Sequence, residues 1–438
     1  MNTDNMLNVL VIVADTMRAD YLGCYGSDWV QTPNLDRLAA EGVLFENCYA
    51  DGLPTIPERR VFFTGKSIIP MREHGGWVPL AEDDVTVPEV ARDHDYTTAF
   101  FADTYHYFRP GLANFHRGFD AWEVIRGQEG DPWQSGPKDS VNPRAVVPEH
   151  HWSEQYDWRI RQYLLNTQDI RTEDDYFCAR TFRKAMTWLE RNERSQPFFL
   201  WIDTFDPHEP WDAPQRFREM YRQDWPVDNY FFGYGVDHSR IRESDYPILR
   251  DLYAAEVSFV DMWIGRLYQR LAELGLLDNT VVVFTTDHGT HIGEQGCVQK
   301  TPGLLNSCVA RLPFIIRHPA QNAPGGSRVK PVVSSLDFAP TFLDFMGIPA
   351  DVEHERRPQH QRGLGARPPE KLDLDGTSVW PLATGQRTVH RPRVYTEFGS
   401  YISVRDENWH YFQHTTGDDP GKGPALYDLQ NDPAETAN

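Results

Sequence analysis

The sequence predicts an α/β fold, in which a mixed, mostly parallel sheet is flanked by helices and followed by a smaller C-terminal α+β subdomain. Two observations predict it. Short apolar runs alternate with helical patterns over most of the chain, and after about Val332 the pattern changes to shorter strand-like pieces. A length of 438 residues allows two or three domains. We therefore expect a large domain over residues 1–331 and a small one over residues 332–438.

Three apolar runs are typical of buried parallel strands, because they carry no polar alternation. They span residues 7–13, 197–202 and 280–285. After the first run, Thr32 and Pro33 are suited to the N-cap and first position of a helix. A long amphipathic stretch at residues 248–274 precedes the third run and predicts a helix.

Two stretches without a clear period predict long loops. The first, at about residues 127–159, is rich in Pro, Gly, Trp and His, and the second, at residues 351–369, is rich in Arg, His, Pro and Gln. Loops of this length are often functional. The first is expected as an insertion near the site. Residues 393–397 and 409–414 are strand-like and belong to the expected C-terminal subdomain.

The composition is that of a folded protein, with 40% apolar and 24% charged residues. A formal net charge of −21 argues against binding to a nucleic-acid polymer or an anionic membrane. A small anionic substrate remains compatible, since a local cationic cleft is screened from the rest of the surface beyond about 8–10 Å. The sequence shows neither a signal-peptide layout nor an apolar stretch of spanning length, and its five cysteines are scattered. A cytoplasmic protein without a membrane anchor is therefore expected.

Polar residues directly follow two of the predicted strands. Asp15 follows the first run, and Asp287 and His288 follow the third. Ligands of open α/β sheets bind at the carboxyl ends of strands. A single Asp in such a place is often only a cap or a turn residue, but two such positions favour a site. Two carboxylates and an imidazole suit Mn²⁺ or Zn²⁺ better than Ca²⁺.

The stretch at residues 52–66 resembles the sulfatase signature, in which a Cys or Ser is followed by x-Pro-Ser-Arg and then by Thr-Gly. Thr55 takes the position of the nucleophile, and Pro57, Arg59 and Lys66 match the pattern. Other landmarks follow in the order of the family, at residues 13–18, 106 with 117–120, 206–210, 286–296, 300, 337–341 and 426–433. The chain thus resembles the sulfatase family of the alkaline phosphatase superfamily over nearly its whole length.

This resemblance implies an alkaline-phosphatase-like fold and a metal-dependent ester hydrolase. The implied metal ligands are Asp15, Asp287 and His288, with Thr55 bridging to the ion. The implied substrate and leaving-group residues are Arg59, Lys66, His208 and Lys300, and His106 and His74 lie where the family often has further substrate-binding residues. For these two histidines a surface or structural role is an equal alternative. One ion is expected rather than two, because beyond Asp206 and His208 no further ligand of a second ion is evident.

Two departures from the family pattern matter. Thr16 stands where relatives have a second acidic residue, and Thr55 and Glu58 replace the Cys and Ser of the signature, so that formylglycine cannot form. Formylglycine hydrate expels sulfate with its second hydroxyl, which threonine lacks. Water attack at phosphorus can clear a phosphothreonine. The sequence therefore favours a phosphodiester or phosphonate monoester as the substrate.

Two other functions remain open. A formylglycine-independent sulfatase or sulfamidase would release sulfate, and an inactive sulfatase-like binding protein would turn over no ester. The expected partner is a small anionic ester. Exposed aromatic residues in the insertions are also compatible with a homo-oligomer.

Overall fold

The computed structural model describes residues 6–74, 77, 79–81, 83–109, 114–137, 139–226, 238–320, 324–354, 370–416 and 423–438. Within these ranges, nine strands form one large sheet in the order β11-β2-β10-β7-β1-β6-β4-β5, with β12 beside β2. The strands are β1 (Asn8–Ala14), β2 (Val43–Tyr49), β4 (Thr97–Ala102), β5 (Ala121–Val124), β6 (Phe198–Thr204), β7 (Thr280–Thr285), β10 (Arg311–Arg317), β11 (Ser327–Val329) and β12 (Val333–Ser334). Of these, β10 runs antiparallel to both its neighbours, and the other pairs are parallel. The predicted mixed, mostly parallel sheet is confirmed.

The three predicted apolar runs are the central strands β6, β1 and β7, which lie side by side. Every residue of these strands is buried. Alternate side chains of a strand point to opposite faces. Accordingly, Val9, Val11 and Val13 join one hydrophobic core, and Leu10 and Ile12 join the other. Burial on both faces explains why these runs are apolar throughout instead of alternating.

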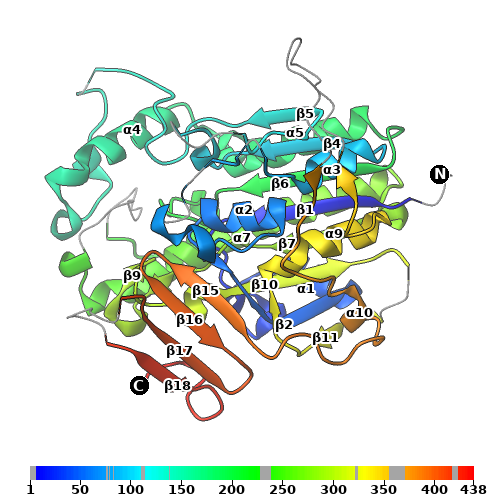
Figure 1. Cartoon of the computed structure of the whole chain (residues 1–438). Coiled ribbons are helices and arrows are strands. Elements are labelled where there is room, and N and C mark those ends of the chain that lie inside the picture. The colour runs from blue at the N-terminus through cyan, green and yellow to red at the C-terminus, as the bar shows by residue number, and fades with distance from the viewer. Residues whose placement is uncertain are drawn as a thin grey trace.

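Helices cover both faces of the large sheet (Figure 1). On one face pack α1 (Pro33–Glu41), α5 (Phe177–Arg191), α6 (Gln215–Glu219) and α7 (Tyr246–Glu273). On the other pack α2 (Ile56–Thr64), α3 (Val87–Asp93), α8 (Ser307–Ala310), α9 (Phe338–Met346) and α10 (Trp380–Ala383). The predicted helices after Thr32 and over residues 248–274 are therefore α1 and α7. Thr32 is the N-cap of α1, but its hydroxyl accepts the amide N–H of Gly23 at 2.9 Å instead of capping the helix.

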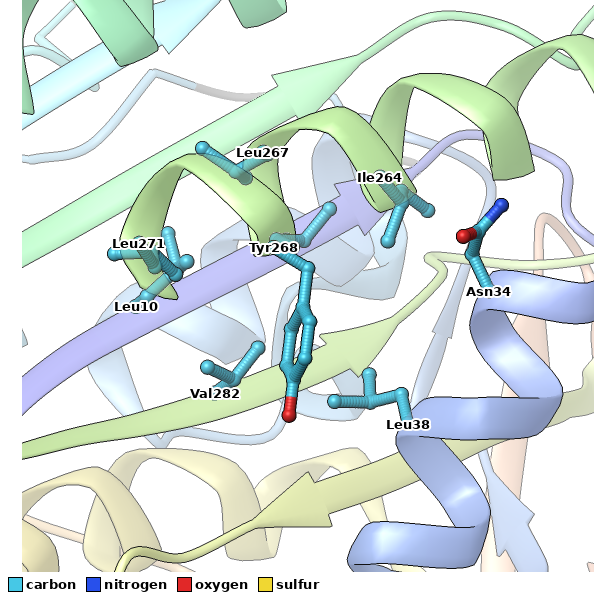
Figure 2. Close-up of a pocket in the computed structure, with 9 residues that line it drawn as sticks. Leu10, Asn34, Leu38, Ile264, Leu267, Tyr268, Leu271 and Val282 are labelled. Atoms are coloured by element: carbon cyan, nitrogen blue, oxygen red, sulfur yellow. The ribbon is translucent and has the colours of Figure 1, made fainter. Parts of the chain in front are cut away.

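A small cavity of about 10 Å³ lies between α1, α7 and the sheet (Figure 2). Leu10 and Val282, from the amino-terminal halves of β1 and β7, form its floor, and Leu38 and Tyr268 line it from the two helices. A volume of this size holds at most about one water. The cavity is thus a packing gap at the end of the strands opposite to Asp15.

The predicted insertion at about residues 127–159 is largely irregular, as expected. It contains short 3-10 helices at Pro143–Ala145, Glu149–His151 and Glu154–Tyr156 and leads into α4 (Asp157–Thr167). Its apolar side chains form a separate small core that includes Val146, Trp152 and Ile160. The insertion therefore packs on α4, on Ile125 after β5 and on Phe177 of α5, in a core separate from those on the two faces of the large sheet.

A second sheet has the order β18-β17-β16-β15-β3 in the described part of the chain. Its antiparallel strands are β15 (Val394–Phe398), β16 (Tyr401–Arg405), β17 (Trp409–His414) and β18 (Ala425–Asp428). The strand-like stretches predicted at residues 393–397 and 409–414 are β15 and β17. The fifth strand, β3 (Gly52–Leu53), comes from the N-terminal part of the chain and pairs parallel to β15. Two strand pairs lie outside both sheets, β8 (His291–Ile292) with β9 (Val298–Gln299) and β13 (Glu353–His354) with β14 (Glu370–Lys371).

The second sheet begins later than the predicted boundary at residue 332. β12 pairs with β2 in the large sheet, and α9 contributes Phe338 and Phe342 to the large core. After Val332 the chain thus first adds β12 and α9 to the large sheet and its core. The antiparallel strands of the small sheet follow from Val394 onwards. Most of the loop predicted at residues 351–369 lies outside the described residues. No helix in the described ranges is both long enough and apolar enough to cross a membrane.

Candidate active site

Three buried carboxylates and an imidazole meet at the carboxyl end of the central strands. Asp15 follows β1, Asp203 lies near the end of β6, and Asp287 and His288 follow β7. All four side chains are fully buried. Because β6, β1 and β7 are adjacent and parallel, these positions lie at the same edge of the sheet. The ligand atoms of Asp15, Asp287 and His288 lie within 4.8 Å of one another.

Arg59 lies at the centre of this cluster. Its Nε and Nη2 atoms donate to the two Asp203 oxygens at 2.9 and 2.7 Å. Its Nη1 atom donates to Asp287, and Nη2 lies 3.1 Å from Asp15 Oδ2. The predicted role of Arg59 was to hold ester oxygens or the nucleophile loop. Its donors are directed at three carboxylates of the protein, which favours the second of these roles.

The charges of the cluster fit a divalent cation. In the described part of the chain, Arg59 is the cation that contacts all three carboxylates, and its single positive charge leaves an excess of two negative charges when all three are ionised. Burial and the neighbouring Asp287 raise the pKa of Asp15 well above its usual value. The Oδ2 atom of Asp15 accepts no hydrogen bond from any described residue. A buried carboxylate oxygen in this state is suited to a metal ion.

The tautomer of His288 also suits metal binding. Its Nδ1 lies 2.9 Å from the carbonyl oxygen of Gly289, which can only accept, so Nδ1 carries the proton. The lone pair of Nε2 then faces Thr55 Oγ1 and Asp287 Oδ2, both at 3.3 Å. Burial lowers the pKa of His288 to about 4, so the ring is neutral at neutral pH. An N–H bonded to a carbonyl oxygen on the far side of the ring is the usual way in which a metal-binding histidine is oriented.

Thr16, which replaces an acidic residue of the family pattern, orients the two aspartates. Its hydroxyl donates to Asp15 Oδ1 at 2.7 Å, and its backbone N–H donates to Asp287 Oδ1 at 3.0 Å. The backbone has φ = +66° here, in the left-handed region. Thr16 therefore contributes hydrogen bonds where a second carboxylate would have contributed charge.

Thr55 is the N-cap of α2 and is almost fully buried, with its Oγ1 directed at His288. Its backbone lies at φ = +36°, an unusual value for a residue with a branched Cβ. Arg59 lies one helical turn further along, which places both residues on the same side of α2. The N-terminal end of a helix favours negative charge, so the position suits an ionising hydroxyl or an anionic ester.

Lys66 lies at the other end of the same helix. α2 spans nine residues, or roughly 13 Å, and ends at Gly65, whose φ of +65° stops it. Lys66 follows that glycine and is half-exposed. The structure thus brings Thr55 and Arg59 together but leaves Lys66 away from them, because eleven positions of helix and cap separate the two ends of the signature.

Glu58, at the position of the signature serine, holds the segment before Thr55. Its Oε2 accepts the backbone N–H of Gly52 in β3 at 2.9 Å. Burial raises the pKa of this carboxyl well above its usual value. The substitution therefore ties the first turn of α2 to the strand that precedes Thr55.

His208 and Lys300 form a second polar group. His208 Nδ1 donates to the Glu209 carbonyl at 2.7 Å, so its Nε2 is the acceptor for Lys300 Nζ at 2.8 Å. Lys300 also pairs with the Glu209 carboxylate at 3.1 Å. Burial and Lys300 hold the pKa of His208 well below its usual value. Lys300 is thus a charged donor whose direction is set by a neutral histidine.

His106 is joined to this group through a phenylalanine and a glutamate. The Phe205 ring lies between the rings of His106 and His208, at centroid distances of 5.8 and 4.1 Å. His106 Nε2 lies 3.1 Å from Glu129 Oε2, and Glu129 belongs to the insertion. Although burial opposes it, the contact with His106 and the nearby charge of Lys300 lower the pKa of Glu129. His74 ends a 3-10 helix (Ile69–His74), and its side chain lies outside what the structure describes.

Sequence reasoning missed Asp203, Glu129 and Glu209. Asp203 had the same signal as Asp15, a carboxylate at the carboxyl end of an apolar run, and could have been found. Tyr107 and Thr104 also donate to it, both at 2.7 Å. Glu129 lies in an insertion without a period, and Glu209 depends on a loop conformation. Glu209 lies within the landmark at residues 206–210, but nothing in that motif indicated its pairing with Lys300.

The fold is similar to that of several solved structures. Phosphonate monoester hydrolase of Agrobacterium radiobacter superposes with a TM-score of 0.74 at 22% identity, over 99% of this chain and 91% of that one. The phosphonate monoester hydrolase of Silicibacter pomeroyi gives a TM-score of 0.71 at 21% identity, over 97% and 89%.

Relatives of known name are sulfatases and a related enzyme. The N-acetylglucosamine-6-O-sulfatase of Bacteroides thetaiotaomicron is 25% identical over 98% of this chain and 82% of its own length. Iduronate 2-sulfatase of Homo sapiens is 27% identical, over 78% and 66%. A multifunctional alkaline phosphatase superfamily protein of Trinickia caryophylli is 24% identical, over 98% and 90%. The family model described as Sulfatase matches residues 7–348, which contain every residue of the site described above. The chain therefore belongs to the sulfatase family of hydrolases.

Proposed function

We propose that this hydrolase cleaves phosphorus esters, namely phosphodiesters or phosphonate monoesters, with Thr55 as nucleophile and a phosphothreonine intermediate. The observation that carries the proposal is the placement of the Thr55 hydroxyl, at the N-terminus of α2 and 3.3 Å from His288 Nε2. It occupies the nucleophile position of the family signature. A threonine offers one hydroxyl, so the covalent ester must be cleared by water, which is easier at phosphorus than at sulfur.

The metal site supports the same chemistry. Asp15, Asp287 and His288 would hold one divalent ion, Mn²⁺ or Zn²⁺, and the excess of buried carboxylates over guanidinium favours it. When bound, such an ion acts as a Lewis acid that lowers the pKa of a nearby hydroxyl and neutralises ester oxygens. Arg59 fixes the carboxylates and, through its place on α2, the position of Thr55.

Lys300 is suited to the leaving group. Its ammonium group donates hydrogen bonds to His208 and Glu209. One of its N–H groups could instead donate to the leaving-group oxygen of the ester. The neutral His208 keeps a lone pair on Nε2 and therefore orients Lys300 without competing for the substrate anion. His106 and its partner Glu129 would line the substrate side of this group.

A sulfate ester is the second candidate. It is favoured by the relatives, because the N-acetylglucosamine-6-O-sulfatase matches 98% of this chain. Without formylglycine, such an activity would also need water to clear a sulfated Thr55. The two candidates therefore differ in the atom, phosphorus or sulfur, that water attacks when the covalent ester of Thr55 is hydrolysed.

The experiment is a panel of aryl phosphate monoester, phosphodiester, phosphonate monoester and sulfate ester substrates, assayed with Mn²⁺ and with Zn²⁺. Wild type is compared with Thr55→Ala and Thr55→Ser. Lys66→Ala, at the other end of α2, is the matched control. We expect turnover of phosphodiester or phosphonate, a loss of roughly 10⁴-fold or more in Thr55→Ala, and at least partial activity in Thr55→Ser.

The outcomes separate the candidate functions. Sulfate release without phosphodiester turnover would assign the chain to the sulfatases that work without formylglycine. Near-normal activity of Thr55→Ala on every ester would remove Thr55 as the nucleophile. No turnover of any ester and no stoichiometric metal would identify a binding protein that retains only the fold.

A further inference from the structure

A second group of possible metal ligands lies outside the active site. His150 and His151 belong to the 3-10 helix Glu149–His151 of the insertion, and Asp245 precedes α7. His150 Nε2 lies 3.1 and 3.0 Å from the two Asp245 oxygens, and His151 Nε2 lies 3.0 Å from Oδ2. The imidazole rings are 4.3 Å apart between centroids. Three ligand atoms thus converge from segments more than ninety positions apart in sequence.

The arrangement has the features of a zinc-type site. Two imidazole nitrogens and one carboxylate oxygen are a ligand set that Zn²⁺ accepts, with a fourth position open to water. Ligands about 2.1 Å from one ion in tetrahedral geometry stand roughly 3.4 Å apart. The separations of 3.0–3.1 Å are a few tenths of an ångström shorter, so the group need only expand slightly around an ion.

The ligands are held in place and yet reachable. Asp245 Oδ2 also accepts the backbone N–H of Arg242 at 2.8 Å, which fixes the carboxylate at the start of α7. The side chain of His151 is 1% exposed and that of His150 is 29% exposed. An ion can therefore enter from the side of His150 and be held against His151.

The group also connects two segments that contact the active site, namely the insertion and α7. The first turns of α7 contact the strand pair that follows His288, since Arg250 Nε donates to the Ile292 carbonyl at 3.3 Å. The insertion supplies Gln128, which donates to Asp206 at 2.9 Å, and Glu129, the partner of His106. A link between the insertion and α7 would thus connect segments on both sides of the catalytic residues.

We propose that His150, His151 and Asp245 bind a second divalent ion of the zinc type, separate from the ion of Asp15, Asp287 and His288. Its role is structural, and it fastens the insertion to the N-terminus of α7. The proposal is independent of the nucleophile and of the ester that is cleaved.

The test measures how many zinc ions each chain of 438 residues binds. Protein stripped with a chelator is reloaded with Zn²⁺, desalted and analysed for zinc per chain, and the affinities are measured by competition with a chromophoric chelator. His150→Gln and Asp245→Asn remove ligands. His116→Gln is the matched control, because this half-exposed histidine packs on Trp122 outside both groups.

We expect His150→Gln and Asp245→Asn each to bind one zinc fewer than wild type, with the affinity of that zinc weakened by more than about 100-fold. His116→Gln should match wild type. Because His150 is partly exposed, its variant is expected to fold, and circular dichroism checks this. An unchanged zinc count and unchanged affinities in folded His150→Gln would overturn the proposal. If only Asp245→Asn lost zinc while His150→Gln did not, the assigned ligand set would also be wrong.

Discussion

The two groups of candidate metal ligands use the same types of side chain but are built in different ways. Asp15, Asp287 and His288 follow adjacent parallel strands, and all three are fully buried. His150 and His151 come from a short turn in an insertion, and they meet Asp245 at a helix start. The first group is placed by the sheet itself, whereas the second exists only after the insertion has packed. A site at strand ends is thus positioned by the core of the sheet, whereas a site in an insertion is positioned by the contacts that the insertion makes with the rest of the fold.

The largest effect should come from removing a ligand at the strand ends. Asp287→Asn is expected to lose the active-site ion and to lower turnover by roughly 10³-fold or more, because the Lewis acid and a partner of Arg59 disappear together. The zinc bound by the His150 group should remain. Metal analysis alongside steady-state kinetics measures both, and a variant that lost both ions at once would show that the two groups are not independent.

The next effect concerns Asp203, which contacts Arg59 but is not expected to bind the ion. Asp203→Asn should lower kcat by roughly 10–100-fold, as for residues that orient ligands, and cost about 1–3 kcal/mol of unfolding free energy. Asp337→Asn is the matched control. Asp337 is an equally buried aspartate that pairs with Arg391 and lies 2.9 Å from His390.

The control should lose similar stability yet keep normal turnover in kinetic and denaturation measurements. Full kcat in Asp203→Asn would mean that Arg59 is positioned by the other two carboxylates alone.

A smaller effect is expected from acid on the metal-free protein. Burial lowers the pKa of folded His288 to about 4 from a usual value of 6.5. Between these values the unfolded chain binds the proton and the folded chain does not, so stability falls as the pH is lowered from about 6.5 through about 4. The loss should be roughly 1–3 kcal/mol.

Denaturant unfolding of wild type, His288→Gln and His94→Gln at several pH values measures it. His288→Gln should show a weaker pH dependence, whereas His94→Gln, a half-exposed histidine outside both groups, should follow wild type. Equal pH dependence in all three proteins would assign the effect to other residues.

Local patterns predicted much of the fold and part of the site. The three apolar runs marked the central strands, and the polar residues after the first and third marked Asp15, Asp287 and His288, because strand ends are short-range features. The signature marked Thr55, Arg59 and Lys66, but no helix was predicted there, and so the spacing did not show that Lys66 lies past the end of α2. The pairing of Glu129 with His106, and of the His150 group with Asp245, depends on how an aperiodic insertion folds back, which no local pattern encodes.

The strand before Thr55, β3, is paired with a strand from the C-terminal part of the chain. β3 pairs with β15, and Thr396 Oγ1 donates to the Ala50 carbonyl across 346 positions of sequence. β15 begins at Val394 and is therefore synthesised after the described strands of the large sheet, the last of which, β12, ends at Ser334. The contacts of residues 50–53 with β15 can form only after the C-terminal strands have been synthesised. The segment that carries the proposed nucleophile thus depends on strands from the C-terminal part of the chain, and a chain truncated before β15 would lack this pairing.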